Sequence, residues 1–181
     1  MPITKIDASN LGGTTLPALN GSALTNISAG KIGQVIGSNN AYGHYTTSTS
    51  YTDLLSASGV TWEISITPTA TTSKVLFMCS LNIAKGANAL QNSRGTVRFF
   101  EKIGSGSYTE FIQDYENVGL YDYGGSGVWR ANILAHHQLR SPNTTSTVTY
   151  KFDFRNNTGS EALYLNSDNR ESDCILMEVL A

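Results

Sequence analysis

Most of this chain, from about residue 31 onward, consists of short segments in which apolar and polar residues alternate. A period of two is typical of strands with one buried face, because successive side chains point to opposite sides. In the segment that begins at Val148, for example, Tyr150 and Phe152 alternate with Thr149 and Lys151. The same pattern recurs in segments 62–66, 75–83, 97–99, 129–135 and 174–180. No segment has the spacing of a long amphipathic helix.

Turn-forming residues separate these segments, among them Asn39-Asn40, Gly104-Ser105-Gly106 and Ser141-Pro142-Asn143. About eight to ten half-buried strands predict an all-β fold, an antiparallel β-sandwich. A jelly-roll-like sandwich is favoured over an immunoglobulin-like one, but the strand pattern alone does not decide the topology.

The first thirty residues do not follow this pattern. Their large apolar residues recur at uneven spacings, and Gly12-Gly13, Pro17 and Asn20-Gly21 interrupt any continuous helix. An isolated extended segment cannot keep such a row from water, whereas several copies or a partner surface can bury it. We therefore expect residues 1–30 to be an extended N-terminal attachment and oligomerisation segment and residues 31–181 to be a β-sandwich head; a disordered leader is the alternative. The attachment residues would be Ile3, Ile6, Leu11, Leu16, Leu19, Leu24 and Ile27.

The stretch Leu16-Pro17-Ala18-Leu19-Asn20-Gly21-Ser22, preceded by Ile3 to Leu11, resembles a family motif. The motif occurs in tail-fibre and other virion-surface proteins of bacteriophages, particularly marine and cyanobacterial ones, where aspartate is commoner at the position of Asn20. The resemblance implies a structural virion protein, usually a homotrimer, with an N-terminal attachment segment and a β-rich head. Segments 62–68, 73–78, 141–151 and 174–179 are also similar to the C-terminal domains of phage fibre-like proteins. This second similarity implies a head that trimerises like tumour-necrosis-factor-like proteins.

The composition disfavours several classes of partner. Only 14% of the 181 residues are charged and the net charge is −2, while Ser, Thr, Asn and Gly make up about two fifths of the chain. Without clustered Lys and Arg we expect no nucleic-acid binding. The longest apolar run, Val75 to Cys79, is far shorter than the roughly 20 residues of a membrane span. We also find no signal peptide, which predicts assembly in the host cytoplasm.

Two cysteines, Cys79 and Cys174, lie in apolar strand-like runs. A buried free thiol behaves as a small apolar side chain, and no signal for an oxidising compartment is present. Two free core thiols are therefore favoured over a disulfide.

No motif points to catalysis, a cofactor or a metal. His136 and His137 are adjacent in a predicted strand, so their rings face opposite sides and cannot bind one metal ion together. Asp114, Glu116 and Asp122 could be interpreted as glycosidase carboxylates, but they lie in a Tyr- and Gly-rich stretch that favours an exposed loop or hairpin over a rigid cleft. We expect a protein that is not an enzyme.

A cluster of aromatic residues is the best candidate recognition surface. Exposed tyrosine and tryptophan rings suit stacking on sugars or packing against protein, and packing in the core or between subunits is the alternative. The cluster comprises Tyr108, Tyr115, Tyr121, Tyr123 and Trp129.

These observations predict a phage virion structural protein, a fibre- or spike-like homotrimer whose head projects from the particle and serves host adsorption. The alternatives are a capsid-decorating or cement protein and a lectin-like module that binds glycans. The expected partners are further copies of the chain, other virion proteins of the tail, portal region or capsid, and a glycan or protein of the host surface.

Overall fold

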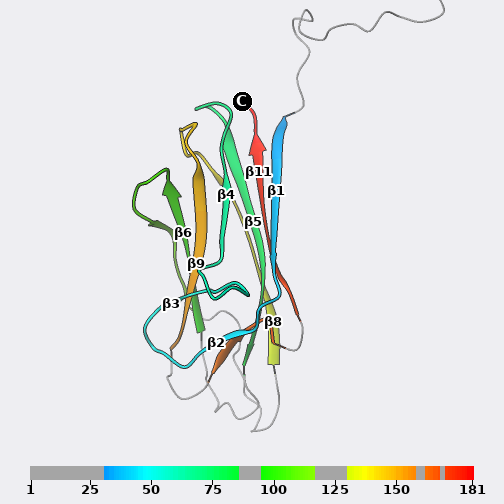
Figure 1. Ribbon diagram of the computed structural model, residues 1–181, viewed down its shortest axis with the longest axis vertical. Coiled ribbons are helices and arrows are strands. Elements are labelled where there is room, and N and C mark those ends of the chain that lie inside the picture. The colour runs from blue at the N-terminus through cyan, green and yellow to red at the C-terminus, as the bar shows by residue number, and fades with distance from the viewer. Residues whose placement is uncertain (1–30, 86–94, 117–129, 158–161, 168–169) are drawn as a thin grey trace, which may run out of the picture.

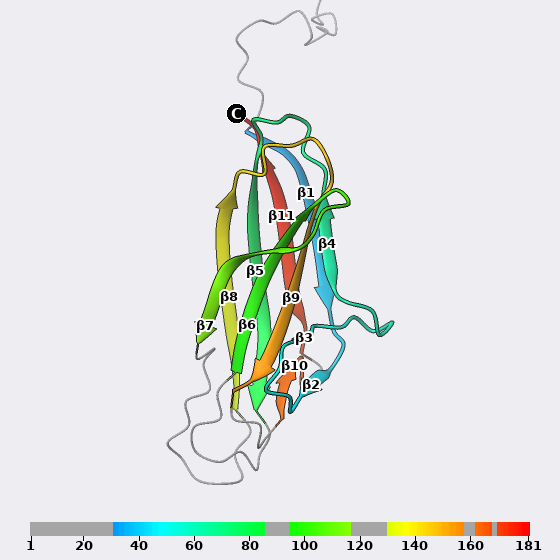
Figure 2. The same ribbon diagram turned by 90° about the vertical axis from the view of Figure 1, so that its left-hand side faces the viewer.

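The computed structural model describes residues 31–85, 95–116, 130–157, 162–167 and 170–181. In this part of the chain every regular element is a strand, and the strands form two antiparallel sheets packed face to face (Figures 1 and 2). The predicted all-β sandwich is confirmed. No helix in these ranges is long and apolar enough to cross a membrane. The attachment segment 1–30 and its seven residues lie outside the described residues, so the boundary near residue 30 stays a prediction.

Six strands form the first sheet, which we call sheet A. Their order is β1–β11–β5–β10–β2, and β8 pairs with the other side of β5. Their bounds are β1 (Ile32–Asn40), β2 (His44–Thr46), β5 (Lys74–Lys85), β8 (Arg130–Arg140), β10 (Leu163–Leu165) and β11 (Ser172–Val179).

Sheet B has five strands in the order β3–β9–β6–β7, with β4 also paired to β9. Their bounds are β3 (Thr52–Asp53), β4 (Glu63–Ile66), β6 (Gly95–Ile103), β7 (Thr109–Glu116) and β9 (Val148–Asn156). The eight longer strands therefore run β1–β11–β5–β8 and β4–β9–β6–β7, so that strands from both ends of the chain alternate within each sheet. This is the double-sheet arrangement of a jelly roll, and it decides the topology that the sequence left open.

The core lies between the sheets and is built by the predicted alternation. In β5 the side chains of Val75, Phe77 and Leu81 are fully buried, and in β9 those of Tyr150 and Phe152 are too. The rings pack edge to face and tilted, with 5.8 Å between the centroids of Phe77 and Phe99 and 5.5 Å between Phe99 and Phe152. Such aromatic contacts add stability beyond the apolar area they bury.

A polar link joins the two sheets at one side of this core. The Tyr150 hydroxyl of β9 donates a hydrogen bond to Glu101 Oε2 of β6 over 2.9 Å. Across the sandwich, Arg140 of β8 binds both Glu101 oxygens from Nε and Nη2, each over 3.2 Å. The guanidinium also lies 4.5 Å from the ring centroid of Phe111. The link satisfies a half-buried charge on each sheet.

A second polar link involves Glu178 of β11, which is fully buried. Its Oε1 accepts hydrogen bonds from Thr69 N–H at 2.6 Å and Thr69 Oγ1 at 2.7 Å, and its Oε2 accepts one from Gln34 Nε2 at 3.0 Å. Burial opposes ionisation, but these hydrogen bonds outweigh it and lower the pKa of Glu178 to about 2. The carboxylate thereby ties β11, the loop before β5 and the first strand together.

The sandwich is elongated along its strands and has two distinct ends (Figures 1 and 2). The first strand starts beside the last, since Ile32 pairs with Val179 and Leu180 N–H donates to the carbonyl oxygen of Lys31 over 2.7 Å. The short strands β2 and β10 lie at the opposite end. We call these the terminal end and the far end.

Candidate assembly and recognition surfaces

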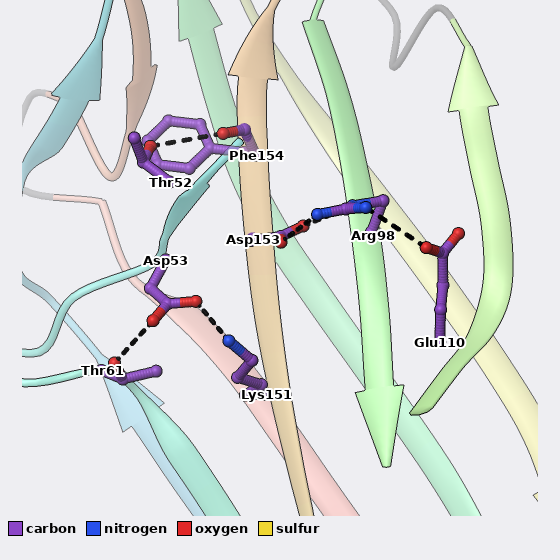
Figure 3. A network of polar contacts seen from close by, with 8 residues as sticks. All are labelled: Thr52, Asp53, Thr61, Arg98, Glu110, Lys151, Asp153 and Phe154. Carbon is purple, nitrogen blue, oxygen red and sulfur yellow. Dashed lines mark hydrogen bonds and ion pairs between the residues drawn. The ribbon is translucent and has the colours of Figure 1, made fainter. Parts of the chain in front are cut away.

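The outer face of sheet B carries charged side chains that pair with one another (Figure 3). Arg98 of β6 binds Asp153 of β9 through two hydrogen bonds, Nε to Oδ1 at 3.0 Å and Nη2 to Oδ2 at 2.6 Å. It also lies 3.4 Å from Glu110 of β7. Lys151 and Thr61 both donate to Asp53, over 2.5 and 3.0 Å. The alternation in β6 and β9 directs these side chains outward while their neighbours fill the core.

Aromatic rings are interleaved with these cations. The Arg98 guanidinium carbon lies 3.4 Å from the ring centroid of Tyr51 and 4.9 Å from that of Phe100. Tyr108, a predicted recognition residue, lies 4.5 Å from Lys102 Nζ and donates a 2.5 Å hydrogen bond to Glu63 Oε1. Burial and this carboxylate raise the pKa of the Tyr108 hydroxyl. Because these charged groups already have partners, they gain little from an additional one.

The outer face of sheet A has the opposite character. Large apolar side chains project from all four of its long strands; Val35 of β1 is 55% exposed and Leu139 of β8 is 48% exposed. They alternate with buried residues such as Leu176 and Phe77. We call this set the outer apolar face: Ile32, Val35, Leu76, Met78, Ile133, Leu139, Ile175, Met177 and Val179.

A pair of tyrosines lies at the far end. Tyr45 of β2 is 60% exposed, and its ring centroid is 5.5 Å from that of Tyr164 in the neighbouring strand β10. Sequence reasoning missed this pair, because the two residues are far apart in the chain and β2 and β10 are only three residues long. The two tyrosines become neighbours only because β2 pairs with β10, and a single sequence does not reveal such a pairing between distant segments.

The rest of the predicted recognition cluster is only partly described. Tyr115 lies near the end of β7, where its backbone pairs with Val97, and Tyr108 precedes the start of that strand. Seven residues of extended chain span about 23 Å, so the structure does not bring Tyr108 and Tyr115 together. Tyr121, Tyr123 and Trp129 lie outside the described residues.

The histidines are separated as a strand requires. His136 is half-buried against Phe99, with 5.3 Å between ring centroids, while His137 is exposed. Burial lowers the pKa of His136 and also that of His44, whose Nδ1 accepts a 3.4 Å hydrogen bond from Leu55 N–H. Within the described residues, no group of three or more His, Cys, Asp or Glu side chains is placed to hold a metal ion.

Other candidate chemical groups are placed as follows. Asp114 and Glu116 belong to β7, and Asp122 lies outside the described ranges. Gly104 to Gly106 form the turn between β6 and β7, in which Gly104 has a φ of 54°. Cys79 and Cys174 face each other on β5 and β11 as buried free thiols, as predicted, and burial raises the pKa of Cys79 to about 12. Such thiols are unreactive at neutral pH.

No protein-family model matches the chain, and no curated protein sequence does. Among solved structures, the chain is similar to the infectious bursal disease virus VP2 subviral particle, with 11% identity and a TM-score of 0.38. The structure of the Gx strain of that virus gives 12% identity and a TM-score of 0.40. In both cases the match covers 82% of this chain but only 38% and 37% of the viral chain. At these scores the likeness carries no conclusion about function.

Proposed function

We propose that this chain is a non-enzymatic structural protein of a phage virion, attached through residues 1–30 and projecting a jelly-roll head. The observation that carries the proposal is that the head has two different ends, with the chain entering at one of them. The chain enters the sandwich at the terminal end, next to its last residue Ala181, and the far end points away from that entry. An anchor at residues 1–30 would therefore leave the whole far end free to project from the particle.

The assembly we propose is a homotrimer of fibre or spike type. The phage-like motif around Leu16 and Leu19 supports it, as does the weakly charged composition. A capsid-decorating role uses the same anchor and differs in copy number, because decoration requires hundreds of copies and a fibre or spike only a few trimers.

Gold-labelled antibodies against residues 31–181 test this proposal on purified particles of the phage that encodes the chain. We expect label on the particle surface, and its position and number per particle distinguish fibre, spike and decoration. A full-length Leu16→Asp, Leu19→Asp variant should lose incorporation, whereas Val60→Asp, on an exposed turn of the head, should not. Particles that lack the chain would refute the proposal.

Host adsorption through a glycan is a second candidate function, which the exposed Tyr45 at the far end, next to the half-buried Tyr164, favours. Tyrosine rings stack on sugar faces and keep a polar edge for hydrogen bonds. On a glycan array we expect Tyr45→Ala to lose a signal that Val60→Ala retains. A Tyr121→Ala, Tyr123→Ala double variant tests the cluster predicted from sequence. Absence of any glycan signal with the wild-type chain would argue against this function.

A further inference from the structure

The register of sheet A aligns the outer apolar face into continuous rows. Val35 of β1 is opposite Met177 of β11, which is opposite Leu76 of β5, which in turn is opposite Leu139 of β8. The next outward row contains Ile175 and Met78 and ends at His137. The Val35 row is thus apolar on all four long strands, and the next row is apolar on the two central strands, between Gly37 and His137.

Charge is scarce on this surface. Among the described side chains that point outward from these four strands, the charged ones are Lys74 and Asp173. They lie at opposite ends of the apolar rows, because Lys74 pairs with Val179 and Asp173 with Ser80. The outer face of sheet B, by contrast, carries the ion pairs of Arg98 and Lys151. The two outer faces therefore differ in character, and an exposed apolar patch is typical of a surface that binds a protein partner.

The size of the surface suits association between folded chains. Four strands spaced by about 4.8 Å, over eight residue steps of about 3.3 Å, give about 500 Å² for the whole outer face of sheet A, with the polar residues at its far end included. Two such faces in contact bury about 1,000 Å² together, which is about the minimum for a specific protein interface. A second copy of the chain offers an apolar face of the same area, so no different protein is needed as the partner.

We propose that the outer apolar face packs against the same face of further copies of this chain, with the strands of all copies running in the same direction around a common axis. The direction rests on the proposed function: copies that share one attachment site must all present their terminal end to it. In that arrangement the Val35–Leu139 rows of neighbouring copies meet at one height, and apolar residues contact apolar residues.

The mass of the full-length chain in solution tests this surface. Wild-type protein at micromolar concentration should have three times the 19.5 kDa mass of the chain. A Val35→Asp, Leu139→Asp variant should weaken association at least tenfold, because it places a charge at each end of the apolar row that crosses the face. Val60→Asp is the matched control, since Val60 is 61% exposed but lies on the turn between β3 and β4. A wild type that is monomeric or dimeric, or a double variant that keeps the trimer mass, would overturn the proposal.

Cross-linking shows whether the copies run in the same or in opposite directions, and it does not depend on the aspartate variants. Lys74→Cys and Ser80→Cys place a thiol at either end of the face, and the native cysteines are buried. With a short bifunctional reagent, copies in the same direction give 74–74 and 80–80 products. Products of 74–80 from a mixture of the two variants, or no products at all, contradict the proposal. Antibody labelling of particles tests the proposed function independently of the mass and cross-linking measurements. If the chain is found on the particle but its copies associate through another surface, the proposed function stands and the self-association of sheet A is wrong.

Discussion

Glu178 is the residue whose environment most needs explanation, since a carboxylate is rarely buried without partners. A Glu178→Gln variant keeps the shape but removes the charge that Thr69 and Gln34 stabilise. We expect it to unfold about 2 kcal/mol more easily at pH 7, as measured by urea denaturation, because hydrogen bonds to a charged group are lost. Glu171→Gln, at an exposed position, is the control and should change stability little.

The stability difference between the wild type and the Glu178→Gln variant should also depend on pH. The folded pKa of Glu178, about 2, is below the ordinary value of 4.5, so its stabilisation is complete above pH 4.5 and is lost as pH falls towards 2. The difference between wild type and Glu178→Gln should therefore shrink across that window. A difference that stays constant down to pH 2 would contradict the assignment.

Which side of β11 faces the core could not be predicted from the sequence, and Glu178 is the reason. Ile175, Met177 and Val179 alternate with Leu176 and Glu178, and both sets contain large apolar side chains. Hydrophobicity alone would turn the purely apolar set inward, but the structure turns Cys174, Leu176 and Glu178 inward. Partners for the carboxylate come from the first strand and from the loop before β5, and a pattern within one strand cannot reveal them.

Among the elements, the packing of β10 against β6 makes a sharp prediction. A Cβ added at Gly95 would overlap Cδ2 of the buried Leu163, whereas one added at Gly37 on the outer side of β1 has no atom within 4 Å. We expect Gly95→Ala to cost about 1–3 kcal/mol in thermal or urea unfolding, as overpacking does. Gly37→Ala is the matched substitution and should be close to neutral. Equal effects of the two would show that β10 does not pack on β6 as described.

The polar link between the sheets through Glu101 gives a second prediction at this scale. Arg140→Met removes the partner of the half-buried Glu101 and leaves the carboxylate to Tyr150 alone. We expect a loss of about 2 kcal/mol in the free energy of unfolding, because an uncompensated charge remains. Arg170→Met, at an exposed position, serves as the comparison. An Arg140→Met protein as stable as the wild type would mean that the link does not hold the sheets together.

The strands themselves were predictable because their alternation is local. Segments 62–66, 75–83 and 148–154 face the core as predicted, and the turn at Gly104 to Gly106 forms where expected. Asn39 and Asn40 are an exception: they end β1 instead of forming the turn. Asn40 Oδ1 accepts a hydrogen bond from Tyr42 N–H, which turns the chain just after the strand. The topology and the pairing of β2 with β10 depend on contacts between distant segments, which a local pattern does not encode.

At the scale of the whole molecule, the two outer faces and the two ends differ in character. The outer face of sheet B pairs its own charges, and we propose that the outer apolar face of sheet A packs against other copies of the chain. The terminal end leads to the predicted attachment segment, and the far end carries the Tyr45–Tyr164 pair. In the proposed fibre-like head, one side would serve self-association, one end the anchor and the other end recognition.

An electron cryomicroscopy map of the purified full-length chain would show which surface joins its copies. We expect a three-fold particle with sheet A of each copy at the axis and the three terminal ends at the same pole. A monomeric particle, or a trimer whose outer apolar faces point to solvent, would contradict this expectation.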